Sequence, residues 1–375
     1  MHTPEEELLS ILKQEGVDFT ASLPCEKIKI LLEMVAEKFF HVPLTREEEG
    51  VGICAGAALA GKRPAMFIQS SGIGNMINAL LSLTGFYELP LAIFVSQRGI
   101  YQEKIAAQFP MGRGLPKILK GAGISHTLIS SPEDFSSLSR KLRTVYKKNR
   151  IHAFLLSPAI WEGSPAKSAA VLDQRPITCM IPEKRQEILP PQYTRYEVLE
   201  LIAPYFENRV VVSNLGWPSK ELYALKHQSS NFYMLGSMGM ATPIGLGISL
   251  SSKKDVVVID GDGSLLMNPG VLATAAHCAP KNLTILAIDN SSYGSTGSQE
   301  TLTGSCVDLE LVARGFGIGN TIKTATKEQL NAAMASEKKG LKFIHALALP
   351  GNRDLQNIPI DHIAIRDQVK EFLRG

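Results

Sequence analysis

Two turns in the second half of the sequence combine residue types that suit a metal ion and a phosphate group. Residues 261–264 are Gly-Asp-Gly-Ser, and residues 290–294 are Asn-Ser-Ser-Tyr-Gly. Glycine leaves backbone N–H groups accessible to a phosphate, and Mg²⁺ prefers oxygen ligands. Asp262 offers a carboxylate, Asn290 an amide oxygen and Ser292 a backbone carbonyl. The pattern therefore predicts a site in which Mg²⁺ bridges these groups to phosphates.

Each turn follows a segment that is predicted to be a buried strand. Residues 256–260 and 284–289 are mostly apolar, which is typical of strands inside a parallel sheet. Ligands of open α/β sheets bind beyond the carboxyl ends of the strands, so both turns are expected at one edge of a sheet. A single Asp-Gly pair is more often an ordinary turn, but two polar turns after neighbouring strands favour a ligand site. A helix is expected over 265–278.

The rest of the chain alternates between strand and helix patterns, which favours parallel sheets covered on both faces. Further strands are expected at 17–20, 41–45, 65–69, 91–96, 127–129, 153–157, 210–213 and 343–348. Prolines accumulate over 158–191 while the periodicity fades, which indicates a linker. The sequence thus predicts an α/β protein with two doubly wound parallel-sheet domains, residues 1–160 and 193–375, joined by a linker over 161–192.

The composition argues against several classes of protein. Lysine and arginine number 39 against 36 aspartates and glutamates, so the net charge of +3 favours neither nucleic acid nor a membrane as partner. The five cysteines have no metal-binding spacing, and the acidic N-terminus is unlike a signal peptide, so a reduced, cytoplasmic protein is expected. Gly72-Ile73-Gly74 lacks the third glycine of a dinucleotide-binding loop, which counts against a nicotinamide-dependent oxidoreductase.

The turn at 261–264, followed by Asn290, resembles the diphosphate- and Mg²⁺-binding motif of the thiamine-diphosphate enzymes. That motif usually ends in two asparagines, so Asp289 is a departure, whereas Asn290 keeps the position of the metal ligand. The resemblance implies thiamine diphosphate and Mg²⁺ as cofactors, with Asp262, Asn290 and Ser292 as metal ligands. It also implies an N-terminal pyrimidine-binding and a C-terminal diphosphate-binding domain, with no middle domain.

The segment 235–240 resembles the turn that holds the aminopyrimidine ring in these enzymes. There, Gly236 would bind the 4′-amino group through its carbonyl, and Met238 would wedge the cofactor into its bent shape. By itself, a methionine is more often core filling. The cofactor-binding residues implied by the resemblance are Gly236, Ser237, Met238, Gly261, Asp262, Gly263, Ser264, Asn290, Ser292, Tyr293 and Gly294.

The same resemblance implies a catalytic glutamate in the first domain. Thiamine chemistry needs a carboxyl group that shares a proton with the pyrimidine N1′ atom. Three acidic residues, Glu47, Glu48 and Glu49, precede a helix rich in small residues, where they would also favour the helix dipole. The family places the glutamate nine positions before a helix glycine, which here is Gly56, and this selects Glu47. Glu48 and Glu49 remain the alternatives.

Over nearly its full length the chain is most similar to the sulfopyruvate decarboxylases of coenzyme M biosynthesis, which are normally split into two subunits. The segments that carry this similarity are 69–75, 98–113 and 293–297, with Ser70 standing where asparagine is expected. The similarity implies non-oxidative decarboxylation of 3-sulfopyruvate to sulfoacetaldehyde and CO₂, or alternatively of phosphonopyruvate or another anionic 2-oxo acid. The substrate-binding residues that it implies are Ser71, Arg98, Gln108 and Arg113.

The loop that contains these residues also holds Lys104, which is expected to be an ordinary solvated charge. Arginine suits a sulfonate because its guanidinium is permanently charged and presents several donors. Since the cofactor of this family lies between domains of different chains, a homodimer or a higher homo-oligomer is expected. A small anionic 2-oxo acid is the expected substrate, and neither nucleic acid nor a membrane is an expected partner.

Overall fold

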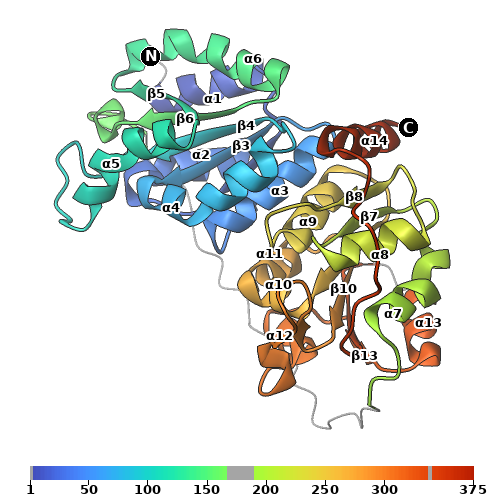
Figure 1. Ribbon diagram of the computed structural model, residues 1–375. Helices are drawn as coiled ribbons and strands as arrows, with labels where there is room; N and C mark the ends of the chain where they lie inside the picture. The colour runs from blue at the N-terminus through green and yellow to red at the C-terminus, as the bar shows by residue number, and fades with distance from the viewer. Residues whose placement is uncertain (1–2, 167–189, 337–339) are drawn as a thin grey trace. The chain divides into compact units, whose positions relative to one another are not determined.

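The computed structural model describes residues 3–166, 190–336 and 340–375 and divides the chain into two units, Met1–Arg175 and Pro176–Gly375 (Figure 1). Each unit is an α/β fold around its own sheet. The predicted linker at 161–192 lies largely outside the described residues, so the predicted domain boundaries stay a prediction. No helix in the described part of the chain has the length and apolar character needed to cross a membrane.

The first unit is built on a six-stranded, all-parallel sheet in the order β2-β1-β3-β4-β6-β5. Its strands are β1 (Phe19–Ser22), β2 (His41–Pro43), β3 (Pro64–Gln69), β4 (Leu91–Ser96), β5 (Ser125–Ile129) and β6 (Ile151–Leu156). The central strands β3 and β4 are apolar along almost their whole length and buried on both faces. This is the pattern of a sheet covered by helices on either side.

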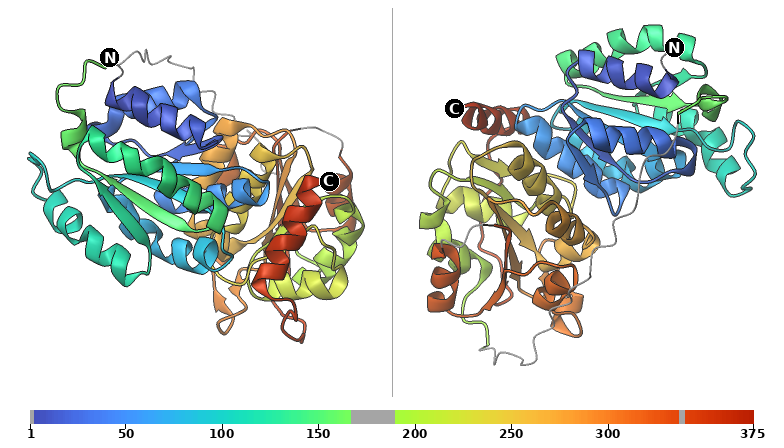
Figure 2. Two further views of the ribbon diagram at one scale, coloured as in Figure 1. Left: turned by 90° about the horizontal axis from the view of Figure 1, so that it is seen from above. Right: turned by 180° about the vertical axis from the view of Figure 1, so that it is seen from behind.

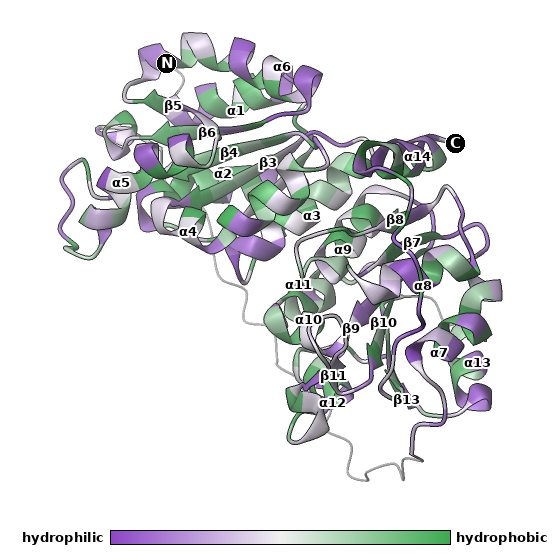
Figure 3. Cartoon of the chain, in the orientation of Figure 1, coloured by the Kyte–Doolittle hydropathy of each residue, from purple (hydrophilic) through white to green (hydrophobic). Residues whose placement is uncertain are grey.

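Six α-helices cover the two faces of this sheet. They are α1 (Pro4–Gln14), α2 (Lys29–Lys38), α3 (Glu47–Leu59), α4 (Ser70–Ala79), α5 (Gln108–Gly121) and α6 (Leu138–Lys148). Helices α1, α2 and α6 share one core with Phe67, Phe94 and Phe154 of the sheet, and α1 and α6 lie side by side (Figures 1 and 2). Helix α6 buries Leu138, Leu142 and Val145 and turns its basic face outward, as Figure 3 shows.

The second unit has a second all-parallel six-stranded sheet in the order β13-β14-β10-β9-β7-β8. Its strands are β7 (Val210–Ser213), β8 (Asn231–Tyr233), β9 (Val256–Gly261), β10 (Leu283–Asp289), β13 (Thr321–Thr324) and β14 (Lys342–Leu347). A small antiparallel pair, β11 (Ser292–Tyr293) and β12 (Gln299–Glu300), follows β10. The helices are α7 (Arg195–Ile202), α8 (Trp217–Leu225), α9 (Ala241–Ser251), α10 (Asp262–Met267), α11 (Val271–Cys278), α12 (Leu309–Gly315), α13 (Lys327–Ala335) and α14 (His362–Arg374).

Two parallel six-stranded sheets with flanking helices confirm the predicted fold class, and the differences are local. The helix expected over 265–278 is two helices, α10 and α11, because Asn268-Pro269-Gly270 interrupts the helical hydrogen bonding. The strands β8 and β13 were not predicted. Both lie at the edges of the second sheet and are only three and four residues long, which leaves little periodicity to detect.

Candidate functional site

The two polar turns of the second unit lie at the carboxyl ends of adjacent strands. Strands β9 and β10 pair in parallel, with Ile288 opposite Gly261, so the residues that follow them emerge side by side. Asp262 is the first residue of α10, and Asn290 directly follows β10. Both side chains are almost fully buried. The structure thus brings the two predicted ligand side chains to one edge of the sheet.

The carboxylate of Asp262 is held by two hydroxyl groups that sequence reasoning missed. Thr301 Oγ1 donates to Asp262 Oδ2 at 2.5 Å, and Thr303 Oγ1 lies 3.2 Å from the same oxygen. Burial raises the pKa of Asp262 above its ordinary value, and these hydrogen bonds offset the effect only in part. No basic side chain among the described residues forms an ion pair with Asp262. A buried acid of this kind suits a divalent cation.

Asp289 stands where asparagine was expected, and its negative charge is stabilised by a histidine on the neighbouring strand. Nε2 of His345 on β14 lies 2.8 Å from Asp289 Oδ2, and Thr303 Oγ1 donates to Asp289 Oδ1 at 2.7 Å. Nδ1 of His345 lies 3.7 Å from Asp308, which is itself paired with Lys323. Burial alone would raise the pKa of Asp289, but the interactions with His345 and Thr303 outweigh it, and that pKa lies below its ordinary value.

The loop after β10 is anchored from a distant part of the second unit. Asn352 Nδ2 donates to the Gly294 carbonyl at 2.8 Å, and Arg195 donates to Asn352 Oδ1 at 2.8 Å. Arg195 also forms a buried bidentate pair with Glu221, at 2.7 and 2.9 Å. These contacts hold Tyr293 and Gly294 in place after the metal-ligand candidates.

Close packing beside the first turn explains one of its glycines. A Cβ atom on Gly263 would lie 2.2 Å from the Tyr293 ring, so only glycine fits under that ring. The adjacent Ser264 accepts a hydrogen bond from Gly239 N at 3.1 Å through its Oγ. The segment 235–240 is therefore joined to the 261–264 turn.

The turn at 235–240 contains two residues in the left-handed region of backbone conformation. Ser237 and Gly239 both have positive φ angles, +61° and +88°. Met238 is partly exposed rather than packed in the core, which agrees with a surface that meets a ligand. Gly236 lies next to it, also partly exposed.

In the first unit, Glu47 is the first residue of α3 and is 4% exposed. Asn75 Nδ2 donates to Glu47 Oε2 at 3.0 Å, and a Cβ atom on Gly72 would lie 2.6 Å from Glu47 Oε1. The two alternatives have different surroundings. Glu49 accepts a hydrogen bond from Thr45 N at 2.6 Å, whereas Glu48 lies 3.6 Å from Arg46. Burial raises the pKa of Glu48, and Arg46 offsets this in part.

The loop after β4 does not leave Arg98 free. Arg98 Nε donates to Glu103 Oε2 at 2.6 Å and Nη2 donates to Oε1 at 2.9 Å. The hydrogen bond from Arg98, aided by N–H groups of the loop, lowers the pKa of Glu103 to about 2. Ser70 Oγ accepts a hydrogen bond from Arg98 N at 3.2 Å, which gives a role to the position where asparagine was expected.

The other predicted substrate residues lie near this loop with fewer contacts. Gln108 begins α5, and its Oε1 is buried with no hydrogen-bond partner among the described residues. Arg113 is exposed, and its guanidinium lies over the ring of Phe109 at 4.8 Å. Ser71 is partly exposed at the start of α4. All of these residues follow the carboxyl ends of β3 or β4.

Two family models match most of the chain. The thiamine pyrophosphate enzyme N-terminal TPP binding domain matches residues 3–121, and the C-terminal TPP binding domain matches residues 216–346. The sulfopyruvate decarboxylase of Methanosarcina acetivorans is 46% identical over 99% of this chain and 97% of its own. The chain belongs to the sulfopyruvate decarboxylase family of thiamine pyrophosphate enzymes. Thiamine diphosphate is accordingly its cofactor, and its reaction is a decarboxylation.

Other relatives match either parts or nearly all of the chain. The separate beta and alpha sulfopyruvate decarboxylase subunits of Methanocaldococcus jannaschii are 45% and 40% identical, over 45% and 41% of this chain and 90% and 94% of their own. A phosphonopyruvate decarboxylase of Streptomyces viridochromogenes is more distant, at 32% identity over 93% of this chain and 89% of its own.

Solved structures agree on the fold. The benzoylformate decarboxylase of Polynucleobacter necessarius superposes with a TM-score of 0.71 at 13% identity, over 95% of this chain and all of that chain. At this identity the likeness concerns the fold alone.

Proposed function

We propose that the protein decarboxylates 3-sulfopyruvate to sulfoacetaldehyde and CO₂ in coenzyme M biosynthesis. The observation that carries this proposal is the 46% identity, over 99% of the chain, to a sulfopyruvate decarboxylase. Both separate subunits of this enzyme in another organism also have their counterparts in this one chain. Decarboxylation of phosphonopyruvate is the second candidate, supported by a relative at 32% identity.

We further propose that Asp262, Asn290 and the carbonyl of Ser292 hold Mg²⁺ against the cofactor diphosphate. The donor set fits, because Asp262 is a buried carboxylate without a cationic partner among the described residues. Asn290 Nδ2 is also buried without a partner among those residues, while its Oδ1 accepts a hydrogen bond from Ser292 N at 3.3 Å. Residues Gly261, Gly263, Ser264, Tyr293 and Gly294 would surround the diphosphate, and Gly236, Ser237 and Met238 the pyrimidine. Mg²⁺ here anchors and neutralises the diphosphate.

Glu47 is the proposed catalytic acid, which exchanges a proton with the pyrimidine N1′ atom. Its burial, the donated hydrogen bond from Asn75 and the close approach of Gly72 hold the carboxyl group in one position. Such positioning is what general acid/base catalysis requires. The bound cofactor supplies the carbon centre that takes up the electrons of the departing carboxylate.

Ser71, Gln108 and Arg113 remain the proposed substrate contacts at the edge of the first sheet. Arg98 has a different role in this proposal, because its Nε and Nη2 atoms already donate hydrogen bonds to Glu103. It orders the loop that follows β4 rather than meeting the substrate itself.

The proposed assembly is a homodimer or a higher homo-oligomer, with the cofactor between domains of different chains. The relatives that occur as separate alpha and beta subunits support an assembly of several chains. A cytoplasmic location stays a prediction from the scattered cysteines of the sequence.

The test is product identification with purified protein, thiamine diphosphate and MgCl₂. Sulfopyruvate, phosphonopyruvate and pyruvate are incubated side by side at one concentration, and aldehyde and CO₂ are quantified. We expect the sulfonate substrate to give the highest kcat/KM. A higher kcat/KM for phosphonopyruvate would favour the second candidate, and no CO₂ from any of the three would refute both.

A further inference from the structure

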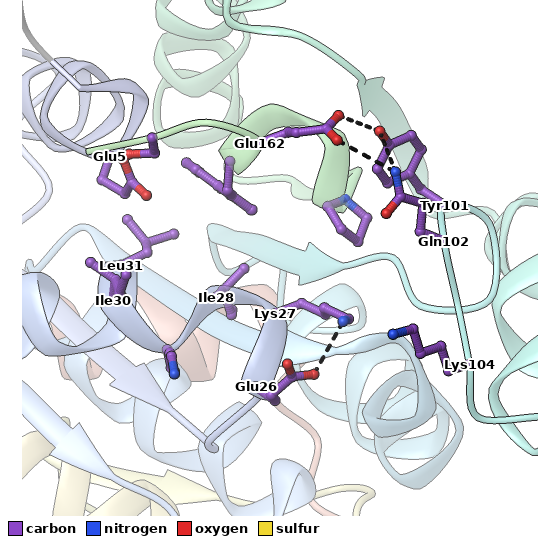
Figure 4. Close-up of a pocket in the computed structure, with 14 residues that line it drawn as sticks. Glu5, Glu26, Lys27, Ile28, Ile30, Leu31, Tyr101, Gln102, Lys104 and Glu162 are labelled. Carbon is purple, nitrogen blue, oxygen red and sulfur yellow. Dashed lines mark hydrogen bonds and ion pairs between the residues drawn. The ribbon is translucent and has the colours of Figure 1, made fainter. Parts of the chain in front are cut away.

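A pocket of about 380 Å³ lies in the first unit, at the carboxyl edge of its sheet (Figure 4). Its walls come from α1, from the turn after β1 and the start of α2, from the loop after β4 and from the segment after β6. Strand β1 is the direct neighbour of β2, whose carboxyl end leads to Glu47. Because both follow the carboxyl ends of neighbouring parallel strands, this pocket and the proposed catalytic residue Glu47 lie at the same edge of the sheet.

The acidic groups that line the pocket already have partners. Glu5 accepts a hydrogen bond from Ser164 at 2.7 Å, and Glu162 accepts one from Tyr101. Glu26 is 67% exposed and lies 3.3 Å from Lys27, which is an ion pair that water and salt weaken. The carboxylates of Glu5 and Glu162 are therefore already hydrogen-bonded, and the weak ion pair of Glu26 with Lys27 is easily broken.

The basic side chains that line the pocket are less completely paired. Lys27, Lys29 and Lys104 all line the pocket. Figure 4 shows the side-chain nitrogens of Lys27 and Lys104 pointing toward one another from opposite walls. Lys104 has no acidic partner among the described residues, because the carboxylate beside it, Glu103, is engaged by Arg98. Two ammonium groups that point toward one another repel, whereas an anion placed between them attracts both.

The backbone of the loop fixes the position of Lys104. The N–H groups of Lys104 and Ile105 both donate to Glu103 Oε1, at 3.1 and 3.0 Å. Glu103 is in turn held by the buried Arg98. The Arg98–Glu103 pair thus positions Lys104 at the pocket, and the charges of Arg98 and Glu103 neutralise each other.

We propose that Lys27 and Lys104 bind the sulfonate or phosphonate group of the 2-oxo acid. This inference rests on the proposed function, and it places the remote anion on a pair of lysines rather than on Arg98. A sulfonate is compact and permanently charged, so two ammonium groups that point toward one another can supply charge-assisted hydrogen bonds to its oxygens in place of a guanidinium. Lys29, on the same wall, adds to the positive potential.

The test is steady-state kinetics of the holoenzyme with sulfopyruvate. Lys104→Met and Lys27→Met each remove one charge and keep much of the side-chain length. We expect each to raise KM about 10- to 100-fold, as for loss of a charge-assisted hydrogen bond, with kcat changed less than about threefold. Lys104→Arg should recover most of the affinity. Lys117→Met, on the exposed face of α5, is the matched control and should leave KM unchanged.

A second measurement separates the substrate from an unrelated anion. Calorimetric titration with sulfoacetate, which cannot be decarboxylated, should show weaker binding to Lys104→Met than to the wild type. If sulfoacetate binding is lost but KM for sulfopyruvate stays normal, the pocket takes another anion and the inference is wrong. Unchanged KM in both lysine variants of an active enzyme also overturns it. A wild type that does not turn over sulfopyruvate would instead refute the proposed function.

Discussion

Nε2 of His345 lies 2.8 Å from Oδ2 of Asp289, and this contact joins β14 to the strand that leads into the proposed metal site. Both side chains are almost fully buried. Burial alone would lower the pKa of His345, but the hydrogen bond with Asp289 and the nearby carboxylate of Asp308 outweigh it and raise that pKa, which favours the cationic form of the imidazole beside the acid.

His345→Leu should therefore leave two buried carboxylates, Asp262 and Asp289, sharing Thr303 without a balancing charge. Breaking a buried pair costs about 3–5 kcal/mol, so we expect a lower melting temperature and weaker retention of thiamine diphosphate. Adding Asp289→Asn should recover both properties, because it removes the uncompensated acid. Thermal unfolding and cofactor titration of the single and double variants check this, and a double variant no better than His345→Leu alone would contradict it.

Asp262→Ala removes the proposed carboxylate ligand of Mg²⁺. Cofactor binding in the presence of MgCl₂ should weaken at least 10-fold, since the diphosphate loses its metal anchor. Fluorescence titration with thiamine diphosphate, with and without MgCl₂, measures the effect. Asp255→Ala, at the opposite end of β9, is the control. Wild-type affinity in Asp262→Ala would show that this residue does not hold the metal.

Glu47→Gln keeps the shape of the side chain and one hydrogen bond to Asn75 but cannot exchange the proton. Cofactor affinity should stay near that of the wild type while kcat falls about 10²- to 10⁴-fold. The neighbouring Glu48→Gln serves as the control and should stay active. If Glu48→Gln is the crippled variant instead, the catalytic position has been misassigned by one residue.

Glu103→Gln tests the pair that orders the loop after β4. The pKa of Glu103 lies at about 2, below its ordinary value of 4.5, because Arg98 stabilises the carboxylate. A depressed pKa means that the stabilisation is present above pH 4.5 and is lost as the pH falls toward 2. The difference in melting temperature between wild type and Glu103→Gln should thus shrink over this range. The double variant with Arg98→Met and Glu103→Gln should lose less free energy of unfolding than the sum of the losses in the two single variants.

The parts of the fold that the sequence revealed are those with long apolar runs. Strands β4 and β7 have the predicted bounds because their residues are buried on both faces and flanked by polar turns. Edge strand β13, Thr-Ile-Lys-Thr, has one strongly apolar residue and gains its order from pairing with β14. Tertiary pairing of this kind has no local signal in the chain.

The residues of the candidate site also differ in whether the sequence could predict them. Asp262 and Asn290 could be predicted because both follow buried strands within one short stretch of chain. The partners Thr301, Thr303 and His345 lie elsewhere, and nothing in their local sequence points to a carboxylate. The engagement of Arg98 by Glu103 depends on a loop whose two ends meet, which the sequence alone did not indicate.

The ends of that loop are pinned to each other by backbone contacts. A Cβ atom on Gly112 would lie 1.7 Å from the Arg98 carbonyl oxygen, and one on Gly99 would lie 2.4 Å from that of Gln108. Gln97 Nε2 also donates to the Gly112 carbonyl at 3.1 Å. The close approach of Gly99 and Gly112 to the opposite end therefore fixes the two ends of the 100–107 loop next to each other. Substitutions within this loop that keep the Arg98–Glu103 pair can thus change the side chains that it presents while its two ends stay in place.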